Sequence, residues 1–182
     1  EQEFRDLCRI YGYKEIRTPT FEDIELFTRS SGETSDIVSK EMYDFYDKGE
    51  RHLALKPEGT APAVRATIEH GLCPQGQLAR LYYITPIFRY GRPQKGRLRE
   101  SHQVGLELIG SPSPAADAEV IELTARFYQQ IGIEDIEVGL NSIGRAEARA
   151  RYREVILSHF ASYLKDQDVE TRAKAEKNPL RL

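Results

Sequence analysis

Two apolar runs joined by a strongly basic loop constrain the fold of this chain more than any other feature. The runs span residues 81–90 and 103–109, and both are rich in residues that favour β-strands. The second run alternates, so that Gln103, Gly105 and Glu107 share one face and the intervening apolar residues share the other. We therefore predict a β-hairpin that turns one face to a core and carries Gln103 and Glu107 on a functional face.

The loop between the two runs concentrates positive charge in a chain that is slightly acidic. The 182 residues hold 26 Lys and Arg against 29 Asp and Glu, a net charge of −3. Before the first acid, Glu100, the loop presents five cations: Arg89, Arg92, Lys95, Arg97 and Arg99. Like charges repel unless an anion joins them, and guanidinium groups form planar forks that suit phosphate. A solvated basic loop is the plain alternative, but the adjacent Gln103 and Glu107 favour an anion-binding site.

A second group of polar side chains precedes the hairpin. Residues 42–55 predict another hairpin, which leads into the sequence KPEGT. Pro57 removes a backbone donor and Gly59 permits tight geometry, so Glu58 and Thr60 project where strand gives way to helix. Two oxygen acceptors at one corner suit a primary ammonium group. Thr60 is equally suited to cap the helix that follows, and an ordinary exposed position is the plain interpretation of Glu58.

These segments together resemble a known family. The stretch FRYGRPQKGRLRESHQVGLE, residues 88–107, is similar to motif 2 of class II aminoacyl-tRNA synthetases in the form found in histidyl-tRNA synthetases. Residues 12–19 resemble motif 1, and PEGT at 57–60 resembles a histidine-contacting segment of that family. LNSIG at 140–144 and KNPLRL at 177–182 extend the resemblance over essentially the whole chain.

The resemblance implies an α+β fold in which an antiparallel β-sheet is flanked by helices. It implies a catalytic core over residues 1–144, with motif 1 at about 4–25 and motif 2 at about 81–110, and a helical extension over 145–182. The domain would be incomplete, because the family's motif 3 has no counterpart in the chain. A start inside a helical pattern, without Met, suggests that the natural N-terminus is missing. A homodimer formed through residues 1–25 is also implied.

The implied activity is that of a histidine–tRNA ligase: ATP-dependent activation of histidine to histidyl-adenylate, followed by transfer to tRNA(His). ATP is the expected substrate, accompanied by Mg²⁺. By the resemblance, Arg89 is the catalytic residue, since it matches the arginine that bridges the α-phosphate and the amino acid carboxylate. Arg97 matches an arginine that reaches the γ-phosphate. Arg92 and Gln94 at the loop tip match residues that meet the acceptor end of tRNA.

The same matching gives a histidine site. Its residues are Glu58, Thr60, Arg89, Gln103 and Glu107. Glu58 and Thr60 would hold the α-ammonium group, and Gln103 and Glu107 would line the side-chain pocket. A carboxylate at Glu107 makes chemical sense there, because it can accept a hydrogen bond from an imidazole N–H.

Two positions depart from the family pattern, and both affect the nucleotide. Gly91 stands where the family has a glutamate that helps to hold adenine, and Ser101 stands where it has a phenylalanine that stacks on adenine. Loss of an aromatic platform costs about 1–3 kcal/mol per stacked base. The ATP site, Arg89, Arg97 and Ser101, is therefore expected to be weakened.

The two departures keep other functions open. One alternative is a catalytically inactive synthetase-like paralogue with a histidine-binding or regulatory role; Glu58 counts against it, because regulatory paralogues usually have Asp there. Another alternative is an α+β dimerisation module with a basic loop, which leaves the joint spacing of motifs 1 and 2 unexplained.

Composition excludes several other classes. Two cysteines without CxxC spacing and four scattered histidines predict neither a disulfide framework nor a metal site, and they favour a cytoplasmic protein. No apolar run approaches the length of about 20 residues that a membrane span needs. Because the net charge is negative, any contact with tRNA must come from local basic patches.

Overall fold

The chain forms two compact units in a computed structural model, which describes residues 1–31, 41–92, 94–141 and 144–179. The first unit is Glu1–Ile136 and the second is Glu137–Leu182. The candidate site lies in the first unit.

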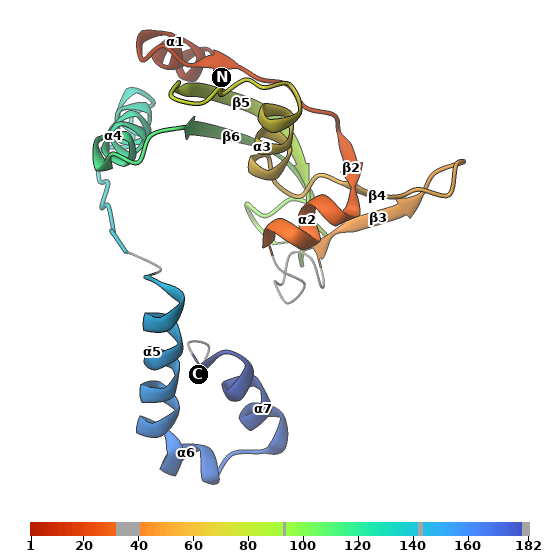
Figure 1. Ribbon diagram of the computed structural model, residues 1–182, viewed down its shortest axis with the longest axis vertical. Coiled ribbons are helices and arrows are strands. Elements are labelled where there is room, and N and C mark those ends of the chain that lie inside the picture. Colours follow the sequence, from red (N-terminus) through yellow and green to blue (C-terminus); the bar gives the residue numbers. More distant parts are fainter. Residues whose placement is uncertain (32–40, 93, 142–143, 180–182) are drawn as a thin grey trace. The chain divides into compact units, whose positions relative to one another are not determined.

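The described residues of the first unit form two three-stranded sheets and four helices (Figure 1). Its elements are α1 (Gln2–Ile10), β1 (Lys14–Glu15), β2 (Phe21–Asp23), α2 (Ile24–Ser31), β3 (Tyr43–Tyr46), β4 (His52–Leu55), α3 (Thr60–Glu69), β5 (Ala79–Phe88), β6 (Glu100–Ile109) and α4 (Pro114–Gln130). One sheet has the order β1-β5-β6 and the other β2-β4-β3, with every pair antiparallel except β1 with β5. The predicted α+β class is confirmed.

The β5–β6 hairpin sets the register of the candidate site. Ten residue pairs join its two strands in antiparallel register. Three of these pairs lie on the predicted functional face: Leu81 with Glu107, Tyr83 with Gly105, and Thr85 with Gln103. Directly opposite residues of an antiparallel pair share a face. The functional face of β6 therefore continues onto β5.

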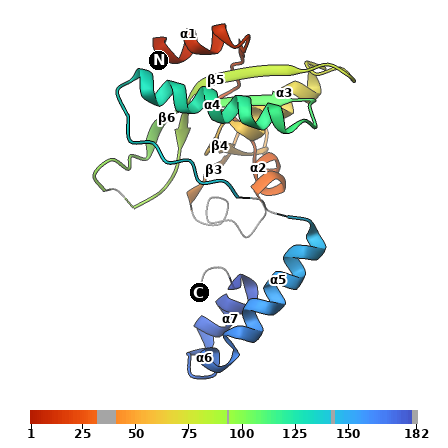
Figure 2. The same ribbon diagram turned by 90° about the vertical axis from the view of Figure 1, so that its left-hand side faces the viewer.

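The other face of this hairpin packs on α1 and α4, which Figure 2 shows next to it. The Phe4 ring of α1 meets the rings of Tyr82 and Phe127 edge-on, with centroids 5.9 and 5.0 Å away. Leu106 and Leu108 of β6 pack against the same cluster, as predicted. Val104, predicted on this core face as well, is 38% exposed.

The second sheet and helix α2 support the corner that precedes α3. The hairpin predicted over residues 42–55 is confirmed as β3 and β4. Phe27 of α2 packs in a small core with Ala54 of β4 and Ala61 of α3. The sequence predicted a polar loop over residues 29–39, but α2 extends to Ser31, and residues 32–40 lie outside the described part of the chain.

The second unit is helical. It contains α5 (Ala146–His159), α6 (Ala161–Lys165) and α7 (Val169–Lys177). A strand predicted from Ile133 to Ser142 is wrong, because residues 133–140 form none; Ser142 itself lies outside the described residues. Val138 and Leu140 are 50% and 78% exposed. Residues that favour strands do so because their side chains pack on a half-buried sheet surface, and this segment has no such surface to pack on.

Candidate functional site

The carboxylate of Glu58 closes the N-terminus of helix α3. Its Oε2 accepts a hydrogen bond from the backbone N–H of Thr60 at 2.6 Å, and its Oε1 accepts one from Ala61 at 2.9 Å. The sequence offered Thr60 as the cap, and the structure gives this role to Glu58 instead, with Thr60 as the first helical residue. A helix N-terminus presents unpaired N–H groups and a partial positive charge, both of which suit a carboxylate.

The hydroxyl groups of Thr60 and Tyr83 meet the carboxylate of Glu107. Thr60 Oγ1 lies 3.2 Å from the Tyr83 hydroxyl, which donates to Glu107 Oε1 at 3.3 Å. Burial raises the pKa of Glu107, and the nearby Glu58 carboxylate adds to this rise, whereas the two hydroxyl groups oppose it. Burial also raises the pKa of Tyr83 to about 12, so its hydroxyl keeps its proton at neutral pH.

Gln103 ties strand β6 to the corner. Its Oε1 accepts a hydrogen bond from the backbone N–H of Gly59 at 2.8 Å. This bond brings the Glu58–Thr60 corner next to the face that carries Glu107. The side-chain amide nitrogen of Gln103 donates to no described residue, so both N–H groups are available to another partner.

Arg89 is held against the same corner. Its Nε donates to the carbonyl oxygen of Pro57 at 2.8 Å, and its backbone N–H donates to the carbonyl of Arg99 at 2.9 Å. Within the described residues, its two terminal nitrogens have no hydrogen-bond partner. Because a guanidinium group is planar, the bond through Nε orients the terminal nitrogens that can bind an anion.

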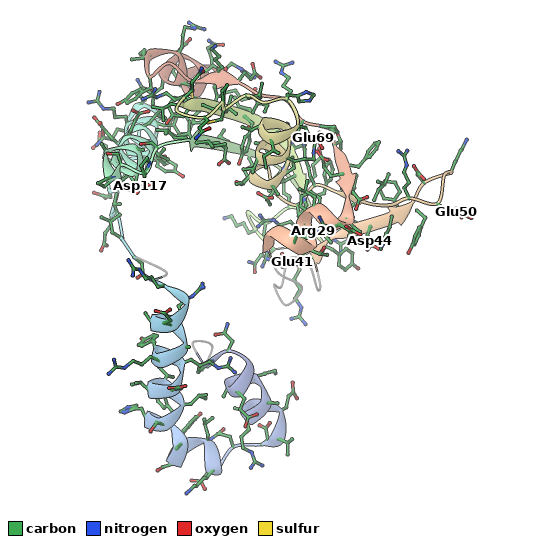
Figure 3. The ribbon with its side chains drawn as sticks, in the orientation of Figure 1. Arg29, Glu41, Asp44, Glu50, Glu69 and Asp117 are labelled. Atoms are coloured by element: carbon green, nitrogen blue, oxygen red, sulfur yellow. The ribbon has the colours of Figure 1, made fainter. Side chains whose placement is uncertain are left out.

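Arg97 already has an anionic partner within the protein. Its Nη2 lies 2.7 Å from Oε1 of Glu41, which precedes strand β3 (Figure 3). The backbone carbonyl of Glu41 also accepts from the N–H of Tyr90 at 2.7 Å. Gly91 lies beside this pair, since a Cβ atom at Gly91 would be 3.0 Å from Arg97 Nε. Gly91, which departs from the family pattern, therefore lies next to Arg97, whose charge is already balanced by Glu41.

The remaining predicted residues lie away from the buried cluster. Arg92, Gln94 and Ser101 are exposed, and none of the hydrogen bonds of Glu58 and Glu107 among the described residues involves them. Arg99 of the same loop stacks over the ring of Tyr90, with its central carbon 4.0 Å from the centroid.

A hollow of about 570 Å³ opens beside the corner. Glu58 and Thr60 line one part of it, and the outer side of α3 lines another through Val64, Arg65 and Ile68. Arg89, Gln103 and Glu107 do not line it, so the hollow adjoins the corner and does not extend over the face of β6 that carries Glu107. In the described part of the chain, no three His, Cys, Asp or Glu side chains come together in a way that could hold a metal ion. No described helix is long and apolar enough to cross a membrane.

Sequence reasoning missed three contributors to the site. Tyr83 contributed only to the prediction of a strand, because its place opposite Gly105 depends on the register of the hairpin, which the structure supplies. The carbonyl of Pro57 carries no signal in the sequence. Glu41 is 56 residues from Arg97, and nothing local marks the two as partners.

Known proteins are similar to this chain in both sequence and fold. Histidine--tRNA ligases from Moorella thermoacetica and Geobacillus thermodenitrificans are each 50% identical to it, over 182 and 183 residues. The matches cover all of this chain and 43% of each relative, so the chain spans less than half the length of these proteins.

Solved structures give the same result at the level of the fold. The apo histidyl-tRNA synthetase of S. aureus has a TM-score of 0.74 and 35% identity, covering 99% of this chain and 42% of that one. A Bacillus halodurans C protein described as an ATP phosphoribosyltransferase regulatory subunit/histidyl-tRNA synthetase has a TM-score of 0.64 at 22% identity, covering 96% and 48%. This second likeness supports the fold alone. The family model for histidyl-tRNA synthetase matches residues 1–171, and the chain therefore belongs to the histidyl-tRNA synthetase family.

Proposed function

We propose that this chain is the N-terminal part of the catalytic domain of a histidine–tRNA ligase. The ligase would activate histidine with ATP to histidyl-adenylate and transfer the histidyl group to tRNA(His). The hydrogen bond between Gln103 Oε1 and Gly59 N carries the proposal, because it joins the two halves of the predicted histidine site. Glu58 and Thr60 stand on one side of that bond, and the strand bearing Glu107 stands on the other.

The histidine substrate would be recognised at both ends. Glu58 uses two of its acceptor positions on the helix N-terminus, and a carboxylate has about four, so it can still accept from the α-ammonium group. Thr60 would supply a second acceptor. Glu107 would accept from an imidazole N–H, and the half-buried position of its carboxylate strengthens such a bond.

Arg89 would assist the chemical step. The histidine carboxylate attacks the α-phosphorus of ATP in line, and negative charge develops on the non-bridging oxygens and on the leaving pyrophosphate. Held by the Pro57 carbonyl, the Arg89 guanidinium can bridge the carboxylate and the α-phosphate without further reorganisation. Catalysis by this residue is therefore positioning combined with electrostatic stabilisation.

The rest of the nucleotide would lie toward the loop. Arg97 would reach the γ-phosphate, for which its guanidinium must share its nitrogens between the phosphate and Glu41. Ser101 would border the adenine. No cluster of three carboxylates is available among the described residues to hold Mg²⁺, so we expect the ion to arrive on the phosphates of ATP.

The remaining parts of the proposal concern partners and organisation. The exposed Arg92 and Gln94 would meet the acceptor end of tRNA(His). Residues 1–25 would form a homodimer interface. The catalytic core would span residues 1–144 and the helical extension 145–182, in a cytoplasmic enzyme.

Histidine-dependent exchange of labelled pyrophosphate into ATP tests the proposal. We expect exchange from the full-length gene product and none from residues 1–182 alone, since motif 3 has no counterpart there. Robust exchange by residues 1–182 would refute the second expectation. Histidine binding by the full-length product without exchange would favour the regulatory alternative. Gly91 and Ser101 also favour that alternative, because both positions depart from the family pattern at the expected adenine site. Absence of both exchange and histidine binding would overturn the proposal.

A further inference from the structure

Tyr83 lies at the centre of the candidate site, between its two halves. The side chain is 4% exposed, and its ring fills the space between Gly59 in the corner and Gly105 on strand β6. A Cβ atom would lie 2.3 Å from ring atom Cε2 if added at Gly59, and 2.1 Å from Cζ if added at Gly105. Both approaches are closer than carbon atoms allow, so the position of the ring requires glycine on both sides.

The hydroxyl group of Tyr83 bridges the two predicted ligand positions. It lies 3.2 Å from Thr60 Oγ1 and 3.3 Å from Glu107 Oε1. A phenol carries one donor hydrogen and also accepts, so it can serve both neighbours at once. Because burial raises its pKa to about 12, the hydroxyl remains a donor throughout the neutral range.

The number of protons in this cluster decides which groups remain free for a ligand. With Glu107 ionised, the hydroxyl protons of Tyr83 and Thr60 are directed along the cluster toward the carboxylate, since a carboxylate can only accept. The lone pairs of Thr60 Oγ1 then stay available to a cationic donor. When Glu107 is protonated, its carboxyl group can donate a hydrogen bond to the neighbouring hydroxyl groups. That bond occupies a lone pair that would otherwise be available within the cluster. The ionised state of Glu107 and the acceptor capacity of Thr60 therefore go together.

We propose that Tyr83 is a positioning residue that couples the two ends of the histidine site, Glu107 at the imidazole and Thr60 at the α-ammonium group. The inference rests on the proposed function, because it takes histidine as the ligand. Tyr83 acts through the other two residues. When the ring N–H of the substrate donates to ionised Glu107, the Tyr83 and Thr60 hydroxyl groups stay directed toward that carboxylate. In this arrangement Thr60 can accept a hydrogen bond from the ammonium group of the same substrate.

The variant Tyr83→Phe removes the hydroxyl and keeps the ring between the two glycines. Its matched control is Tyr82→Phe, since Tyr82 is also buried, at 7% exposed, and is the next residue of the same strand. Tyr82 faces the α1–α4 core, and its hydroxyl has no hydrogen bond to any described residue. The control therefore reports the general cost of removing a buried tyrosine hydroxyl from β5.

Two measurements on the full-length gene product separate positioning from packing. In pyrophosphate exchange, Tyr83→Phe should raise KM for histidine about tenfold and leave KM for ATP within about twofold, because a charge-assisted hydrogen bond at one end of the site is lost. The acidic limb of the pH profile for histidine should also move to higher pH, since Glu107 loses a donor that stabilises its ionised form. Tyr82→Phe should change neither quantity.

A merely structural Tyr83 would give a different result. If Tyr83→Phe and Tyr82→Phe show the same KM for histidine and the same pH profile, the inference is wrong and the proposed function stands. If the wild-type protein shows neither histidine-dependent exchange nor histidine binding, the proposed function is wrong. In that case carbon NMR titration of Glu107 decides the coupling itself: a higher pKa in Tyr83→Phe supports it, and an unchanged pKa overturns it.

Discussion

Arg89 and Pro57 are joined by a hydrogen bond of 2.8 Å, from the guanidinium Nε to the backbone carbonyl oxygen. The bond links the residue proposed for catalysis to the corner that carries Glu58 and Thr60. A backbone carbonyl cannot rotate away as a side chain can, so the acceptor is fixed by the fold. The orientation of Arg89 is therefore built into the β4–α3 corner.

Replacement of Arg89 should reduce the rate of the chemical step. We expect Arg89→Gln to lower kcat for pyrophosphate exchange by about 100- to 1,000-fold, the usual effect of removing one preorganised charge-stabilising donor. Arg99→Gln is the matched control, because Arg99 belongs to the same loop and stacks on Tyr90. Comparable activities for the two variants would show that Arg89 does not act on the transition state.

Glu58 should contribute to stability as well as to binding. Its carboxylate caps helix α3, and loss of a helix cap costs about 0.5–2 kcal/mol. We expect Glu58→Ala to lower the free energy of urea unfolding by about 1 kcal/mol. Glu69→Ala, at the exposed C-terminal end of the same helix (Figure 3), should stay within about 0.5 kcal/mol of wild type. A pure ligand role for Glu58 would leave both variants as stable as wild type.

Glu107 should make the fold less stable as pH rises. Its pKa is raised in the folded protein, chiefly by burial, so the folded state holds this proton to higher pH than the unfolded state does. The associated stability is complete below about pH 4 and is lost as pH rises through the folded pKa. Glu107→Gln should therefore unfold at higher urea concentration than wild type at neutral pH, and this difference should vanish in acid.

The control for that measurement is Glu100→Gln at the exposed start of the same strand. Its urea unfolding at neutral pH should stay within about 0.5 kcal/mol of wild type. A stabilising effect of Glu107→Gln that is constant across the pH range would contradict the burial of an ionised carboxylate. The variant should also lose histidine binding, so that stability and function oppose each other at this residue.

Restoring the two family residues should strengthen the adenine site. Gly91 does not need a glycine conformation, and a side chain there would adjoin Arg97. We expect the new carboxylate in Gly91→Glu to compete with Glu41 for Arg97. The double variant Gly91→Glu with Ser101→Phe should lower KM for ATP about tenfold, since stacking on an aromatic platform contributes about 1–3 kcal/mol. Ser101→Leu, which is apolar but has no π face, should give a smaller gain. An unchanged KM for ATP in the double variant would mean that neither position contacts the nucleotide.

The elements with strong local patterns could be predicted from the sequence. The hairpin around the arginine loop follows from aromatic content and period-two alternation. Apolar spacing predicts a helix over residues 115–131, and the structure has α4 there, with Ser113 as its cap. The grouping of Glu58, Thr60, Gln103 and Glu107 came from the family resemblance, and their contacts with one another were not readable from spacing.

The predictions that failed concern residues whose structural partners are distant in the sequence. The apolar segment from Ile133 to Leu140 has the composition of a strand but meets no sheet edge in the described structure. The sequence offered Thr60 as one possible cap of α3, because residue preferences favour threonine there, but the backbone N–H groups of Thr60 and Ala61 donate to the longer side chain of Glu58 instead. The pairing of Arg97 with Glu41 depends on tertiary structure alone.

Strand β6 pairs with β5 along one edge, and no described strand covers the other. Ten residues, Glu100–Ile109, thus present a row of backbone donors and acceptors to any strand that approaches. The stretch ESHQVGLELI contains neither lysine nor proline, the residues with which natural proteins commonly block such edges. When the 182-residue chain is produced by itself, intermolecular strand addition at this edge should make it prone to aggregate, and a partner strand laid along β6 would keep it soluble.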